Sequence, residues 1–158
     1  MDNKIRSEIF QTRSAAYKDL SNNYYMILNC VKKMDRNEPS FGDLKVTCED
    51  DQFVDITIAG RIYRTSFEAD ISKSKFVGRL TLLMRPNGVD ISKAVAIAKI
   101  DFDRLGNIVS ISSNSFGDKS VKITDCSNCE KVFSTIIAEN LMQSFQESLE
   151  VAESNHWL

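Results

Sequence analysis

The chain has little of what most catalytic and metal-binding sites are built from. Its 158 residues include one histidine, one tryptophan, two prolines and six glycines. The histidine, His156, lies two residues from the end of the sequence, where chains tend to fray. There is no glycine-rich phosphate loop, no GxGxxG and no GxSxG motif. We therefore expect no enzyme, no catalytic residues and no cofactor.

Long apolar runs and an excess of positive charge are also missing. No apolar stretch approaches the roughly 20 residues needed to cross a bilayer. The first ten residues, MDNKIRSEIF, lack the apolar core of a signal peptide. We expect a cytoplasmic protein with reduced thiols and no membrane partner. The net charge of −2 leaves no cationic surplus for phosphates, so nucleic acid is not expected as a partner.

Four cysteines are too few to indicate a disulfide scaffold in a chain of this length. Two of them form a CxxC, Cys126 and Cys129, which is compatible with a zinc site, a redox pair or the start of a helix. A structural zinc ion would need two further ligands. Cys30 and Cys48 lie on apolar faces of their segments, where they are expected to be small core residues. We therefore predict no metal site.

The helix interpretation of the CxxC segment has direct support. Ser127 and Glu130 stand three residues apart just before an apolar helical pattern, which is the arrangement of a capping box. Asp125 offers a second cap. We expect Ser127 to cap a helix that begins there.

The hydrophobic pattern predicts an α+β fold. Apolar residues recur at three- and four-residue spacing over 4–33, with a weak point at 21–23, and again over 129–153. Between them the spacing changes to two, in short segments separated by turn residues. We expect one domain, residues 1–158. It would have a long N-terminal helix, an antiparallel meander of five or six strands, and a C-terminal amphipathic helix packed on the sheet.

Two details of the strand pattern are specific enough to test. A two-residue turn at Ala59-Gly60 would pair Ile56 with Tyr63, and Asp55 with Arg64 on the other face. The alternating alanines at 94, 96 and 98 should share one side of their strand.

Carboxylates are the remaining candidates for chemistry. Asp101 and Asp103 stand two apart on a predicted strand, as do Glu68 and Asp70. Paired carboxylates can bind Mg²⁺ or transfer protons. On a strand whose opposite side is apolar, they more often form the solvated face.

Local structure does not explain two aromatic residues and one acidic turn. Phe116 lies inside the polar segment SNSFGDKS, and Trp157 lies at the end of the chain. Glu49, Asp50 and Asp51 form a cluster of carboxylates. Exposed aromatics can anchor an interface, and carboxylates favour a basic partner. We predict these five residues as the partner-binding surface.

The leading hypothesis is a non-catalytic cytosolic protein–protein interaction module, such as a small inhibitor, immunity or accessory protein that acts by stoichiometric binding. Its partner would be another protein with a basic surface. The sequence is also compatible with a homodimer. The alternatives are a small-molecule-binding domain with an apolar pocket between sheet and helices, and a carboxylate–metal enzyme using Asp101 and Asp103.

Overall fold

The fold is described by a computed structural model that covers residues 2–36, 44–50, 52–71, 76–112 and 121–156. Within these ranges only the backbone is described at 35–36, 49–50, 144–145 and 148–156. Helix α1 (Asn3–Lys32) comes first, followed by the 3-10 turn η1 (Lys33–Arg36), a six-stranded sheet and helix α2 (Cys126–His156). The α+β prediction is confirmed.

The sheet is an antiparallel meander in which every strand pairs with its neighbours in sequence. Its order is β1-β2-β3-β4-β5-β6, and the 3-10 turn η3 (Ile91–Lys93) precedes β5. The strands are β1 (Lys45–Asp50), β2 (Phe53–Ile58), β3 (Arg61–Asp70), β4 (Val77–Pro86), β5 (Val95–Phe102) and β6 (Ile108–Ile111).

The predicted β2–β3 hairpin is confirmed with its register. Ile56 lies opposite Tyr63 and Asp55 opposite Arg64. The Arg64 guanidinium donates two hydrogen bonds to the Asp55 carboxylate, at 2.7 and 2.8 Å. Gly60 has a φ of 75°, a conformation that suits glycine in a tight hairpin turn.

The predicted row of alanines is wrong. Ala98 is buried opposite Leu82, whereas Ala96 is exposed opposite Leu83. The pairing of β5 with β4 shifts between Leu82 and Leu83, and such a bulge moves the following side chains to the other face of a sheet.

Both helices pack against one face of the sheet, and the core lies between them. Leu20 and Ile27 of α1 meet Phe133 and Ile137 of α2 in one buried cluster, with Tyr63 and other inward side chains of the strands. The opposite face of the sheet is polar and carries the Asp55–Arg64 and Arg79–Asp101 pairs. None of the described helices is both long and apolar enough to cross a membrane.

Helix α1 is continuous through the predicted weak point at 21–23. Asn23 explains this, because its side chain faces inward. Its amide donates to the backbone carbonyls of Asp103 and Arg104, at 3.2 and 2.8 Å. A polar residue that would disfavour a helix in isolation is here satisfied by a tertiary contact.

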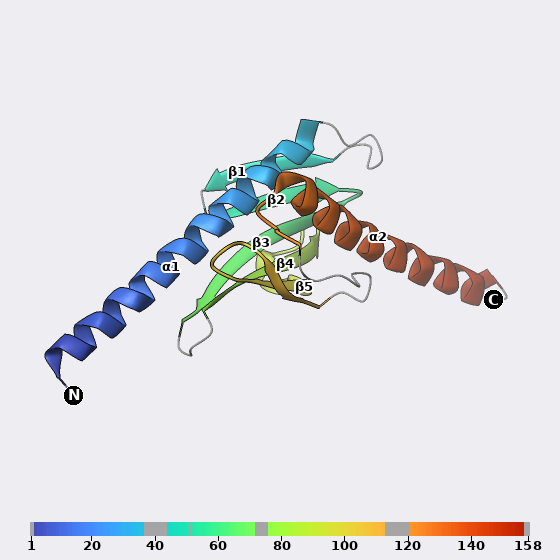
Figure 1. The fold of residues 1–158 in the computed structure, drawn as a ribbon. Coiled ribbons are helices and arrows are strands. Elements are labelled where there is room, and N and C mark those ends of the chain that lie inside the picture. Colours follow the sequence, from blue (N-terminus) through green and yellow to red (C-terminus); the bar gives the residue numbers. More distant parts are fainter. Residues whose placement is uncertain (1, 37–43, 51, 72–75, 113–120, 157–158) are drawn as a thin grey trace.

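The expectation that the cysteines are all reduced is wrong. Cys30, near the end of α1, forms a disulfide with Cys126, the first residue of α2. The two helices meet at this bond and diverge from it, so that the two termini lie at opposite ends of the molecule (Figure 1). Cys129 is a buried thiol whose pKa is raised by burial, and Cys48 is exposed and lies outside the disulfide.

The start of α2 also differs from the predicted capping box. The helix begins at Cys126, and the Asp125 carboxylate accepts the N–H of Ser127 at 2.9 Å. Ser127 is therefore inside the first turn, and Asp125 is the cap. The disulfide joins the first residue of this helix to α1.

Candidate functional site

Strand β3 has an open edge. It is ten residues long, but β2 pairs only with its first four, Arg61–Arg64. Val54, next along β2, donates its N–H to the Thr65 side chain at 3.0 Å. From Thr65 to Asp70, β3 therefore has β4 on one side and, among the described residues, no strand on the other.

Alternate residues of β3 direct their backbone groups to this edge. In an antiparallel pair, hydrogen-bonded positions alternate with positions that are not hydrogen-bonded. The two-residue turn before Arg61 orients the odd-numbered residues toward β2, and the contact of Val54 with Thr65 follows the same pattern. The N–H and C=O groups of Phe67 and Ala69 thus point to the open side.

A cleft of about 450 Å³ lies beside this edge and is called the edge cleft here. Helix α1 forms one wall, and β3 with the turn before β2 forms the other. Side chains from both faces of the sheet line it, which can occur only where a neighbouring strand is missing. The lining residues are Tyr17, Ser21, Tyr24, Tyr25, Gln52, Phe53, Arg64, Thr65, Ser66, Phe67 and Leu83.

The aromatic wall of the edge cleft is held in place by specific contacts. Tyr24 stacks on Phe67 with 4.7 Å between ring centroids. Its hydroxyl donates to the Gln52 carbonyl at 2.6 Å and lies 3.0 Å from Thr65 Oγ1. Burial raises the pKa of Tyr24 to about 12, partly opposed by the Thr65 hydrogen bond. These contacts hold the Tyr24 and Phe67 rings in place.

One hydroxyl of this wall has no partner. Ser21 Oγ is buried and makes no hydrogen bond among the described residues. On the other side of the cleft, the Arg64 guanidinium lies 4.0 Å from the centre of the Phe53 ring. The cleft thus combines apolar surface with a few polar groups.

A second hollow of about 500 Å³ continues along the same edge. It is called the Arg13 hollow and is lined by Arg13, Glu68, Ala69, Asp70, Ile71, Val77 and Arg79. Arg79 is bound to the Asp101 carboxylate at 2.8 Å. Arg13 is exposed and takes part in none of the ion pairs among the described residues.

Helix α1 extends past the sheet (Figure 1). The exposed residues of this helix include several large apolar ones. Ile5 and Ile9 continue the stripe that Ala16 begins to bury, but every residue of α1 before Ala16 is exposed. Phe10 is 72% exposed, and Tyr17 is half exposed at the rim of the edge cleft. The exposed side chains of Ile5, Ile9, Phe10 and Tyr17 are called the apolar surface of α1 here, and Tyr17 is the one among them that lines the edge cleft.

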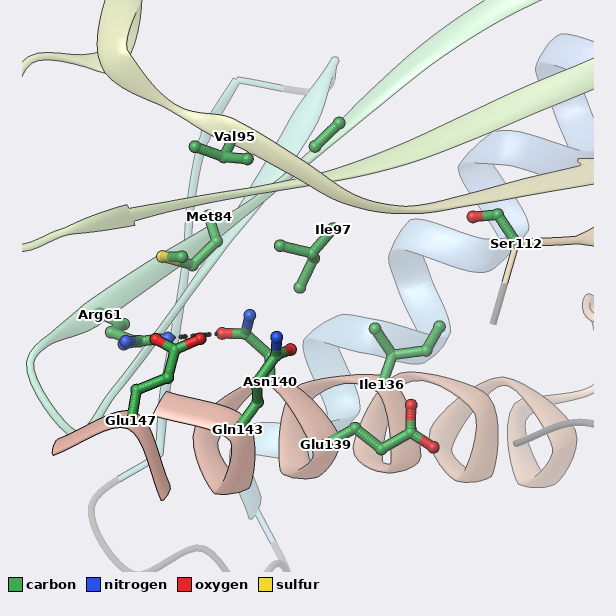
Figure 2. Close-up of a pocket in the computed structure, with 11 residues that line it drawn as sticks. Arg61, Met84, Val95, Ile97, Ser112, Ile136, Glu139, Asn140, Gln143 and Glu147 are labelled. Carbon is green, nitrogen blue, oxygen red and sulfur yellow. Dashed lines mark hydrogen bonds between the residues drawn. The ribbon is translucent and has the colours of Figure 1, made fainter. Parts of the chain in front are cut away.

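A different cleft, of about 490 Å³, separates α2 from β4 and β5 (Figure 2). Asn140 projects from α2 into it, and its Oδ1 accepts hydrogen bonds from Arg61 at 2.7 Å and Tyr63 at 2.8 Å. Apolar side chains form its floor and acidic and amide side chains its rim. The floor includes Met84, Ile97 and Ile136, and the rim Glu139, Gln143 and Glu147.

The carboxylates predicted as a metal or acid–base pair have structural partners. Asp101 accepts two hydrogen bonds from Arg79, and Ser110 lies 3.3 Å away. Asp103 accepts the backbone N–H groups of Leu105 and Asn107, both at 2.9 Å, in the β5–β6 turn. No group of three or more potential metal ligands was found among the described residues.

Most of the partner-binding surface predicted from the sequence lies outside the described residues. This applies to Asp51, Phe116 and Trp157. Glu49 and Asp50 are the last two residues of β1, where only the backbone is described. The surface predicted at these five residues stays a prediction.

The residues of the edge cleft escaped the sequence analysis. Tyr24 fits the apolar pattern of a helix and Phe67 that of a strand, so both are expected in the core. The strand pattern does not show that the pairing of β2 with β3 ends before Thr65. The one signal in the sequence is the difference in strand length. The alternating pattern after Gly60 is longer than the pattern before it, so β2 is too short to pair with the whole of β3.

Comparison with protein-family models, with curated proteins and with solved structures found no match to this chain.

Proposed function

We propose that the protein is a non-catalytic interaction module that acts by stoichiometric binding of another protein. The supporting observation is the apolar surface of α1, formed by Ile5, Ile9, Phe10 and Tyr17, next to the open edge of β3. Small inhibitors, immunity proteins and accessory proteins work in this way.

The free energy gained by burying exposed apolar side chains favours a bound partner. Full burial of an isoleucine or phenylalanine side chain contributes about 1.5–3 kcal/mol. Aromatic anchors surrounded by smaller contacts supply much of the binding energy of protein interfaces. Ile5 and Ile9 stand four residues apart and Phe10 and Tyr17 seven apart, so each pair shares one face of the helix and a partner that wraps around α1 can cover both pairs.

Partner capture tests this proposal. Tagged protein is used to isolate partners from an extract of its natural source, and bound proteins are identified by mass spectrometry. The double variant Ile9→Ser with Phe10→Ser should lose the specific partner and keep its fold, because both side chains are exposed. Met142→Ser is the matched control, since Met142 is 58% exposed on the other helix, α2. Equal capture by all three proteins would contradict the proposal.

The surface predicted from the sequence is examined in the same assay. Phe116→Ala and Trp157→Ala remove the aromatic candidates. Asp50→Lys with Asp51→Lys reverses the acidic turn, and a basic partner should then bind more weakly. Titration calorimetry of the captured pair should give a fixed stoichiometry, and turnover of the partner would contradict the non-catalytic proposal.

A small-molecule-binding domain is the second candidate function. The cleft between α2 and the sheet favours it, because its volume, apolar floor and Asn140 are typical of ligand sites (Figure 2). Native mass spectrometry of protein from its natural source should then detect a bound molecule. Ile97→Trp, which fills the cleft, should abolish that binding, whereas Val109→Trp on β6 should not.

The carboxylate–metal enzyme is the third and least supported candidate. Both Asp101 and Asp103 would have to release the hydrogen bonds that they accept now. We propose the cytoplasm as the place of action, although the Cys30–Cys126 disulfide weighs against it because such bonds are rare there. Alkylation of free thiols at the moment of lysis, followed by peptide mapping, decides whether the bond exists in the cell.

A further inference from the structure

We propose that the edge cleft binds an extended segment of the partner protein, which pairs with the open edge of β3 as an additional strand. This inference rests on the proposed function and names the chemistry of the partner. The segment would carry an apolar side chain toward α1 and a carboxylate near Arg13. Addition of a strand to an exposed sheet edge is a recurrent mode of peptide recognition.

The backbone of β3 provides the first argument. Phe67 and Ala69 direct N–H and C=O groups to a side where no described strand lies. An unpaired edge is a template for another strand, and proteins usually cover it or block it with charge or proline. Here the edge is flanked by two hollows, so it is accessible along its length.

The side chains around the edge provide the second argument. A guest strand would alternate its side chains between the two faces of the sheet. On the α1 face the guest would meet Tyr17, Tyr24 and Phe67, which favour an apolar or aromatic side chain. On the other face it would meet the polar Arg64 and Ser66 beside the apolar Phe53 and Leu83, so only the α1 face requires an apolar side chain.

Charge provides the third argument. The Arg13 hollow also contains Glu68 and Asp70, which lie with Arg79 on the face of the sheet away from α1. Arg79 is paired with Asp101, whereas Arg13 on α1 has no ion-pair partner among the described residues. A carboxylate on the guest strand, either a side chain or a chain end, would complement this guanidinium. The partner segment is therefore extended, apolar at alternate positions and acidic toward the Arg13 end.

Selection of peptides tests the inference and does not require the partner itself. A phage-displayed library of random linear peptides is selected on the immobilised full chain. We expect recovered peptides to carry apolar residues at every second position and to contain an acidic residue. Arg13→Gln should remove the acidic preference. Failure to recover any binder, or recovery of peptides without this alternation, would overturn the inference.

Two variants of Ala69 separate backbone pairing from other modes of binding. Ala69→Pro removes the N–H that points to the open edge and leaves the pairing with β4, whereas Ala69→Val keeps that N–H. Ala69→Pro should weaken binding of the selected peptide by about threefold to tenfold, as expected for the loss of one hydrogen bond. Circular dichroism confirms that both variants fold. Equal affinity of the two variants would count against strand addition.

Amide hydrogen exchange gives a readout on the protein itself. The bound peptide should slow exchange at Phe67 and Ala69 and leave Ser66 and Glu68, which face β4, nearly unchanged. Protection confined to α1 would overturn strand addition. Self-association of the free protein that Ala69→Pro abolishes would identify a second copy as the occupant and equally overturn it.

The two proposals can fail separately. If Ile9→Ser with Phe10→Ser loses the captured partner and Ala69→Pro retains it, the interaction function stands and the extended-segment inference falls. If neither variant affects capture, both fall.

Discussion

Cys30 near the end of α1 is bonded to Cys126, the first residue of α2, across 96 positions of the sequence. The bond lies where the two helices meet, and their other ends point away from each other (Figure 1). The bond thereby holds together the end of the first helix and the start of the last helix.

Loss of this disulfide should destabilise the fold. The double variant Cys30→Ala with Cys126→Ala should lower the free energy of unfolding by about 2–4 kcal/mol, because the bond closes a long loop in the unfolded chain. Urea denaturation measures the change. The parent protein with reductant is the control and should move in the same direction. An unchanged midpoint in both samples would contradict the prediction.

The cap of α2 gives a second prediction. Asp125→Ala should cost about 1 kcal/mol, since its carboxylate accepts the N–H of Ser127 and lies at the positive end of the helix dipole. Ser127→Ala is the matched control and should change the free energy of unfolding by less than about 0.5 kcal/mol. The reverse order of effects in chemical denaturation would show that Ser127 is the cap after all.

The sequence was informative where the deciding interactions are local. The register that joins Asp55 to Arg64 depends on a two-residue turn and on alternation within a few residues of it, so it could be predicted. The helix cap was misassigned by two residues, because Asp125 and Ser127 are both good capping residues and their sequence preferences do not distinguish them.

Features that depend on distant packing could not be predicted. The pairing of Cys30 with Cys126 requires the relative position of two helices, which no local pattern records. The open edge of β3 depends on where β2 begins, because a start at Phe53 leaves the second half of β3 with no described strand on that side. A bulge after Leu82 similarly moved Ala96 to the face opposite Ala98.

Alkaline pH should destabilise the protein through Tyr24. Its pKa is raised by burial to about 12, so the folded protein holds the phenolic proton more tightly than the unfolded chain. This contribution is complete below pH 10 and is lost as the pH rises from about 10 to 12. Tyr63, whose pKa burial also raises, adds to the same loss.

Denaturation as a function of pH checks this prediction. Tyr24→Phe should reduce the fall in the free energy of unfolding between pH 10 and 12, whereas Tyr17→Phe, with a half-exposed ring, should not. A profile that is identical in parent and Tyr24→Phe proteins would rule out this role of Tyr24.

Two hydroxyls near the edge cleft should respond oppositely to removal. Ser21 Oγ is buried without a partner among the described residues, so Ser21→Ala should leave stability unchanged or raise it slightly. Thr65 Oγ1 accepts the Val54 N–H and lies beside the Tyr24 hydroxyl, so Thr65→Val should cost about 1–3 kcal/mol. Thermal denaturation of both variants measures the difference, and equal losses would contradict it.

The sequential strand order has a consequence for how the chain folds. Each strand pairs with a neighbour in sequence, so the sheet can grow one hairpin at a time with short loop closures. Proteins dominated by such local contacts fold faster than those that must first join distant segments. In this chain the distant segments are α1 and α2, which must dock against each other and the finished sheet. Docking of the two ends of the chain, followed by oxidation of Cys30 and Cys126, is then expected to be the slow and final stage of folding.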